Sequence, residues 1–174
     1  MLLFAAAASF YRSPYNASNF TLIPDSVEYA SGGFNIADAG RYKIEINGKQ
    51  LPPRYPPWFS LLIAAPSYLI AGDEPGNPIY AVLLFALIGV VAAYSIGTQM
   101  FGIGGGVLLA SIIMASPLYR HYAREVMADV PACALMLLAC ALYLRITSGR
   151  YTTARLTWLS AGITIAFALS APYF

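Results

Sequence analysis

Long stretches without charge dominate the pattern of hydrophobic and polar positions along the chain. No Asp, Glu, Lys or Arg occurs from Pro75 through Tyr119, or from Leu156 to Phe174. A helix needs about 20 apolar residues to cross the hydrocarbon core of a bilayer, so these stretches predict membrane-spanning helices. The pattern predicts four of them, over residues 78–97, 103–119, 130–144 and 156–174. Residues 1–11 are also apolar but would cover only about 16 Å as a helix, which predicts part of a further span.

Residues 12–77 form the only sizeable polar stretch and carry signals of local structure. Asp25 as N-cap, with Glu28 three residues later, predicts the start of a helix, and Gly40 suits its end. The alternating residues 42–46 are followed by an Asn-Gly pair, which predicts a short β-hairpin. We therefore expect a loop with its own juxtamembrane elements.

The proline-containing segment 52–71 decides the topology. Its unbroken apolar part, residues 58–71, is shorter than a crossing requires and is typical of an interfacial or re-entrant helix. If this segment does not cross, Asp25 and Asp129 face the same compartment. If it crosses, they face opposite compartments. We favour the version without a crossing.

The positions of the basic residues set the orientation. The loop 145–155 holds three arginines and no acid, so the positive-inside rule places it in the cytoplasm. Counting back through the predicted spans puts residues 120–129 outside, residues 98–102 inside and residues 72–77 outside. The polar stretch 12–77 would then be an external loop.

Composition supports the same class of protein. Of the 174 residues, 59% are hydrophobic and only 10% are charged, and the mean hydropathy is +0.62. Soluble domains carry about 25% charged residues, and disordered chains are far less hydrophobic. Two cysteines exclude a disulfide scaffold, and a net charge of +2 gives no basic field for nucleic acid. The expected fold is all-α, a polytopic helical membrane protein with external juxtamembrane helices.

This topology gathers acids and arginines on one membrane face. Carboxylates can act as a general base or bind a metal, and arginines bind phosphate oxygens with two parallel N–H groups. The chain has one histidine, so a histidine-based metal site is not supported. The candidate site residues on this face are Asp25, Glu28, Arg54, Arg120, Arg124 and Asp129.

Three short motifs then follow one another along the chain. They are the acidic motif 25–30, the proline-rich motif 52–58, and Arg124 with Asp129-Val130-Pro131. Their order resembles the polytopic glycosyltransferases of the GT-C class, in the branch with protein O-mannosyltransferases and lipid A aminoarabinose transferases. The resemblance covers nearly the whole chain and corresponds to the N-terminal part of those longer enzymes, so the chain is expected to be a truncated GT-C module.

The resemblance implies a sugar donor linked to polyprenyl or dolichyl phosphate, and a protein, lipid or glycan acceptor. It implies Asp25 as the base or the group that positions the acceptor. Many relatives carry a second acid directly after it, where this chain has Ser26, so either Glu28 takes that role or the role is absent. No organic cofactor is implied, but a divalent metal at Asp129 is possible. The donor phosphate would be held by Arg54, Arg120, Arg124 and Asp129.

Several alternatives stay open from the sequence. Asp25 and Glu28 can be no more than a helix cap, and Arg120 and Arg124 can simply extend to the membrane interface. The chain can also be a noncatalytic membrane subunit or a truncated product, and the fragment alone is expected to be inactive. A secondary transporter is disfavoured because the predicted spans carry no ionisable group. The expected location is a multi-pass position in a bacterial or archaeal plasma membrane, with the active face outside.

Overall fold

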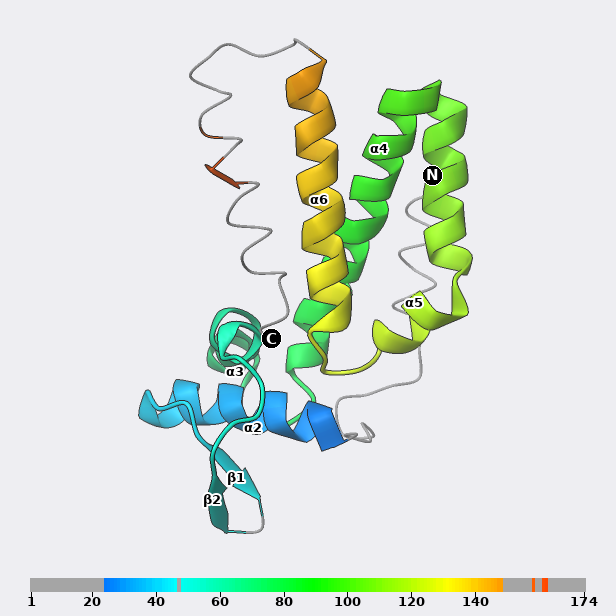
Figure 1. Ribbon diagram of the computed structural model, residues 1–174. Helices are drawn as coiled ribbons and strands as arrows, with labels where there is room; N and C mark the ends of the chain where they lie inside the picture. The colour runs from blue at the N-terminus through cyan, green and yellow to red at the C-terminus, as the bar shows by residue number, and fades with distance from the viewer. Residues whose placement is uncertain (1–23, 47, 149–157, 159–160, 163–174) are drawn as a thin grey trace. The chain divides into compact units, whose positions relative to one another are not determined.

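The computed structural model describes residues 24–46, 48–148, 158, 161 and 162, which are mostly helical. They fall into two compact units (Figure 1). The first unit contains residues 24–84 and 121–128, and the second contains residues 85–120 and 129–148. The expected spans over residues 1–11 and 156–174 lie almost wholly outside the described residues.

In the first unit, helix α2 (Pro24–Ala39) is the helix that the sequence predicted near Asp25. It begins one residue earlier than expected, so Asp25 lies in the first turn and is not the N-cap. The reason is that proline, whose φ is fixed near the helical value, is well suited to the first helical position. The predicted end is confirmed, because Gly40 has a φ of 63° and donates its N–H to the Ile36 carbonyl at 3.0 Å.

The predicted hairpin is also confirmed. Strands β1 (Ile44–Ile46) and β2 (Lys49–Leu51) are antiparallel, and Ile46 pairs with Lys49. Between them Gly48 has a φ of 74°, a conformation that glycine adopts without steric cost. The hairpin extends from one side of α2, where Ile44 is buried (Figure 1).

The segment that decides the topology forms a short helix. A π-helical stretch, η2 (Ser60–Ala64), leads directly into α3 (Ala65–Ala71), and both pack against α2. Pro66 lacks the N–H that a regular α-helix needs. The stretch before it has the wider π spacing, in which the Ala65 N–H donates to the Ser60 carbonyl. At about 1.5 Å per residue, η2 and α3 together cover about 18 Å, less than a bilayer core.

Helix α4 (Pro78–Ala115) corrects the expected boundary between the first two spans. The sequence predicted a turn over residues 98–102, but the helix continues until Gly102, which has a φ of 75°. The two halves of α4 run side by side after this break (Figure 1). Glycine at position 97 permits this close approach, because a Cβ there would collide with the carbonyl group of Gly105.

Two further helices follow. The second half of α4 ends at Ala115 instead of residue 119, because Pro117 disfavours helical geometry in the residue before it and starts a new helix, α5 (Pro117–Tyr122). Helix α6 (Asp129–Thr147) is slightly longer than the predicted span 130–144. Its start at Asp129, with a proline in the first turn, agrees with the sequence.

Two of the described helices, α4 and α6, are long and apolar enough to cross a membrane. Both present apolar side chains at the surface of the second unit, for example Val91, Phe101, Ile103 and Met136. Exposed apolar surface of this extent is typical of a protein that contacts lipid or another protein. The described residues are therefore a mostly helical chain with two candidate spans and one short hairpin.

Candidate functional site

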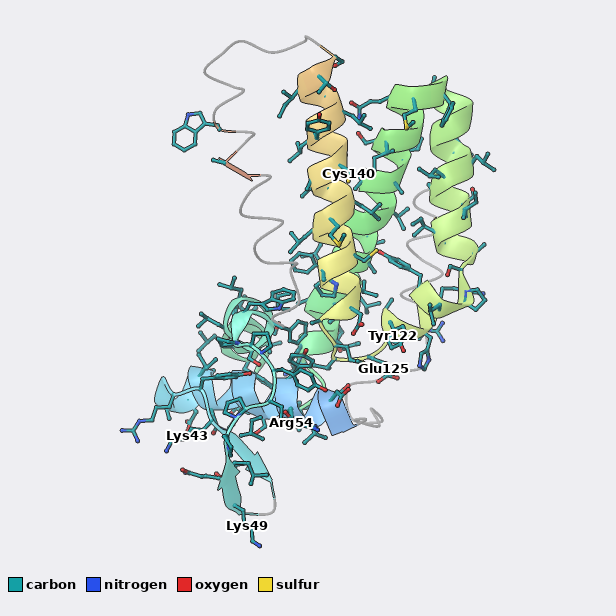
Figure 2. The ribbon with its side chains drawn as sticks, viewed as in Figure 1. Lys43, Lys49, Arg54, Tyr122, Glu125 and Cys140 are labelled. Carbon is teal, nitrogen blue, oxygen red and sulfur yellow. The ribbon has the colours of Figure 1, made fainter. Side chains whose placement is uncertain are left out.

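The first turns of α2 meet the proline-rich segment that follows β2. Arg54 donates its Nε–H to Glu28 Oε1, and its Nη2 pairs with the same oxygen. The same Nη2 lies 3.7 Å from Asp25 Oδ1. Figure 2 shows Arg54 beside α2. Three residues that the sequence predicted as site residues therefore form one cluster, which we call the acidic cluster: Asp25, Glu28 and Arg54.

The members of the acidic cluster differ in exposure. The side chain of Glu28 is 8% exposed, whereas those of Asp25 and Arg54 are 39% and 63% exposed. Glu28 is therefore the buried anchor of the ion pair, and Asp25 is the carboxylate that a ligand can reach. The second oxygen of Glu28, Oε2, is buried and has no hydrogen-bond partner among the described residues. A buried carboxylate needs a cation beside it, which Arg54 supplies.

Aromatic rings hold the proline-rich segment against α2. The rings of Tyr29 and Tyr55 stack with centroids 5.0 Å apart, and Phe59 meets Tyr29 edge-on at 4.9 Å. Tyr42 donates its hydroxyl to the Tyr55 carbonyl at 2.7 Å, and Ser60 donates its hydroxyl to the Tyr29 carbonyl at 3.1 Å. These contacts fix the position of Arg54 through its neighbour Tyr55.

Two glycines in the middle of α2 make this approach possible. A Cβ on Gly32 would lie 2.7 Å from Cε2 of Tyr42, and a Cβ on Gly33 would collide with Ala64. The sequence analysis did not single out these residues. A Gly-Gly pair inside an otherwise helical pattern is a signal of close backbone approach and could have indicated this contact.

The electrostatics of the acidic cluster extend to a tyrosine. The pKa of Tyr55 is raised above its ordinary value, first by a side-chain hydrogen bond with Asp25 and then by burial. The pKa of Arg54 is raised as well, chiefly by its hydrogen bond with Glu28 and by the charge of that carboxylate. Asp25 therefore lies between a cation and a protonated phenol, both of which orient its carboxylate.

The remaining predicted site residues lie elsewhere in the chain. Arg120 and Asp129 belong to the second unit and are exposed, with Asp129 in the first turn of α6. Arg124 belongs to the first unit, in the connection between α5 and α6, and is partly buried. Ser26, which replaces the second acid of the GT-C motif, is fully buried in α2. These positions leave the predicted roles of Arg120, Arg124 and Asp129 as predictions.

A metal site was a second expectation for these acids. Within residues 24–46 and 48–148, no group of three or more His, Cys, Asp or Glu side chains could hold a metal ion. The divalent metal at Asp129 stays a prediction. In the acidic cluster, Arg54 compensates the charge of one of the two carboxylates.

A hollow of about 480 Å³ also lies in the first unit, on a different face of α2. Its lining is mostly apolar and includes the acids Glu45 and Asp73. The lining residues do not include any member of the acidic cluster. Successive residues in a helix are rotated by about 100°, so the face with Val27 and Phe34 points away from Asp25 and Glu28. The acidic cluster is therefore a surface site and not part of this hollow.

Comparison with known proteins adds no relative to this picture. No protein-family model, curated protein or solved structure matches the chain. The resemblance to GT-C glycosyltransferases accordingly depends on the order of the three sequence motifs.

Proposed function

We propose that the chain contributes the donor and base site of a membrane glycosyltransferase. The donor would be a sugar linked to polyprenyl or dolichyl phosphate, and the acceptor a hydroxyl of a protein, lipid or glycan at the external membrane face. The observation that carries the proposal is the acidic cluster, in which an accessible arginine pairs with a buried glutamate and lies close to an accessible aspartate. Transfer of a phosphate-linked sugar needs these two groups, a base and a cation for the phosphate.

Arg54 is suited to the donor phosphate. A guanidinium carries five N–H donors in a planar fork, and the contacts with Glu28 and Asp25 involve Nε and Nη2. Nη1 carries two further donors on a side chain that is 63% exposed. Nη1 can donate to a phosphate oxygen, and the anchored position of Arg54 reduces the entropy lost on binding.

Asp25 is suited to the role of base. The acceptor oxygen would attack the anomeric carbon from the side opposite the phosphate, and the bond from that carbon to the phosphate oxygen would break with its electron pair. The phosphate is already a good leaving group, so the protein mainly orients it and balances its charge. The proton of the acceptor hydroxyl would pass to Asp25, and the configuration at the anomeric carbon would invert.

The membrane helices support a lipid-linked donor over a transported solute. The described part of α4 carries no Asp, Glu, Lys or Arg, and α6 carries them only at Asp129 and Arg145, near its two ends. Transporters place ionisable groups near the middle of the membrane. An uncharged bundle can instead accommodate the apolar tail of the donor.

Sugar transfer in membranes tests the proposal. Cells would express the full coding region with Asp25→Asn, and their membranes would receive a radiolabelled polyprenyl-phosphate sugar and a hydroxyl acceptor. Loss of a general base lowers turnover by about 10²–10⁴-fold, and we expect a loss in this range. Asp38→Asn is the matched control, because Asp38 is an exposed aspartate on the same helix outside the acidic cluster.

A second variant separates binding of the donor from chemistry. We expect Arg54→Gln to raise the KM for the lipid-linked sugar more than it lowers kcat, because the lost contact is to the donor phosphate. Equal activities of the Asp25→Asn and Asp38→Asn membranes would overturn the role of Asp25. Wild-type membranes that transfer no sugar from any polyprenyl phosphate would overturn the proposed function itself.

A further inference from the structure

A second hollow, of about 550 Å³, lies in the second unit between α4 and α6. It is found where the first half of α4 approaches its break at Gly102 and where α6 ends, so both helices present their ends here. The positive-inside rule predicts that this end of the helices lies at the cytoplasmic face. The lining residues are Val91, Tyr94, Ser95, Thr98, Gln99, Met100, Leu144, Arg145 and Ser148.

Arg145 is the cation of this hollow. It lies in the last turn of α6, and its Nη2 donates to the Ser95 hydroxyl of α4 at 3.2 Å. Gln99 holds the two helices together next to it by donating its amide to the Ala141 carbonyl at 3.3 Å. Arg145 itself is exposed, so its guanidinium is held at the edge of the hollow and not inside the protein.

The other lining groups fit a phosphate ester. The hydroxyl residues Ser95 and Ser148 line the same hollow, and no acid lines it. The Thr98 hydroxyl is buried beside Gly106 and does not face a ligand. Hydroxyl and guanidinium donors together are the groups that bind phosphate oxygens in proteins. The apolar side chains of Val91 and Met100 in the same lining would contact a hydrocarbon chain.

We propose that this hollow binds the phosphate group of an anionic membrane lipid, with Arg145 as the anchoring cation. Basic pockets between membrane helices on the cytoplasmic side are suited to anionic lipid headgroups, because the cytoplasmic leaflet is negatively charged. This site is separate from the acidic cluster and does not depend on glycosyl transfer.

Native mass spectrometry of the full chain in detergent tests the proposal. The chain would be titrated with phosphatidylglycerol or with phosphatidylcholine, which differ in net charge. We expect preferential binding of phosphatidylglycerol, and a loss of affinity of about tenfold or more in Arg145→Gln, the effect of losing one charge-assisted hydrogen bond to the phosphate. Arg150→Gln is the matched control, because it removes the same charge from the same basic segment. It should retain the wild-type preference.

A charge-conserving variant and a competitor complete the test. Arg145→Lys keeps the charge but loses the planar fork, so it should bind phosphatidylglycerol better than Arg145→Gln and less well than the wild type. Equal losses in Arg145→Gln and Arg150→Gln would overturn the proposal in favour of diffuse attraction. Equal binding of both lipids would also overturn it. Displacement of phosphatidylglycerol by millimolar inorganic phosphate would overturn the lipid assignment and leave a site for free phosphate.

Discussion

Asp25 and Glu28 show how burial assigns different tasks to two carboxylates on one helix. Glu28 is nine-tenths buried and bound to Arg54, so its charge is compensated in place and it orients the guanidinium. Asp25 is close to the same cation but accessible to a ligand. The sequence gives both residues the same chemistry. It could not predict their difference in burial, which depends on where the segment with Arg54 returns against α2.

Glu125 provides a test of burial at the residue scale. Burial raises the pKa of this carboxyl, which lies in the connection between α5 and α6, and its Oε2 is buried without a hydrogen-bond partner among the described residues. The folded chain therefore binds the proton more tightly than the unfolded chain, whose pKa is about 4.3. The tighter binding of this proton stabilises the fold fully below about pH 4.3, and this stabilisation is lost as the pH rises through the pKa of Glu125 in the folded chain.

Replacement of Glu125 by glutamine removes this penalty. We expect Glu125→Gln to melt at a higher temperature than the wild type at neutral pH, and at about the same temperature near pH 4. Thermal unfolding followed by circular dichroism in detergent measures both. Glu74→Gln is the control, because Glu74 is an exposed glutamate in another loop, and it should not change the melting temperature at either pH. A Glu125→Gln variant that is less stable at neutral pH would contradict the argument.

At the scale of elements, local signals were sufficient where one residue type decides the conformation. Gly40 ends α2 and Gly48 turns the hairpin, and both adopt a positive φ as their positions predicted. The turn over residues 98–102 was predicted from the bounds of the two apolar spans, and the break in α4 lies at the last of these residues, Gly102. The packing of η2 and α3 on α2 could not be predicted from periodicity, because it depends on residues far apart in the chain.

The glycines of α2 test this packing. Alanine favours a helix over glycine by about 1 kcal/mol, so Gly33→Ala would stabilise an isolated α2. In the fold, its methyl group would collide with Ala64 and lie 3.1 Å from the Ala65 nitrogen. Overpacking of this kind costs about 1–3 kcal/mol, and we therefore expect a lower melting temperature. Gly104→Ala is the control, because nothing lies within 4 Å of its Cβ position, and it should be neutral or stabilising.

At the scale of the whole molecule, the number of crossings decides whether the candidate residues can share one compartment. The first half of α4 is long enough to cross, but residues 103–115 cover only about 20 Å, short of a bilayer core of about 30 Å. The segment η2–α3 is shorter still. The positive-inside rule and helix length therefore disagree for residues 103–115. The rule favours a crossing, because only then is loop 72–77, which has acids but no Lys or Arg, outside when the arginines after α6 are inside.

Labelling of single cysteines resolves this disagreement. The native Cys133 and Cys140 are first replaced by alanine, which is small and apolar enough for α6. Exposed positions are then available on either side of the two segments whose crossing is tested, η2–α3 and residues 103–115. Lys49 points away from α2 at the tip of the hairpin (Figure 2), and Asp73 follows α3. A membrane-impermeant maleimide on intact cells reports which cysteines lie outside.

We expect labelling of Lys49→Cys, Asp73→Cys and His121→Cys on intact cells, and of Ser148→Cys only after the membrane is opened, since each of these residues is exposed. If η2–α3 crosses, positions 49 and 73 will label from opposite sides. If residues 103–115 do not cross, positions 73 and 121 will label from opposite sides, and Arg120 and Asp129 cannot act with Asp25 on one substrate. The donor site would then be limited to the acidic cluster. Asp25 and Arg54 both precede η2–α3 and α4, so neither of these segments separates them, whether it crosses or not.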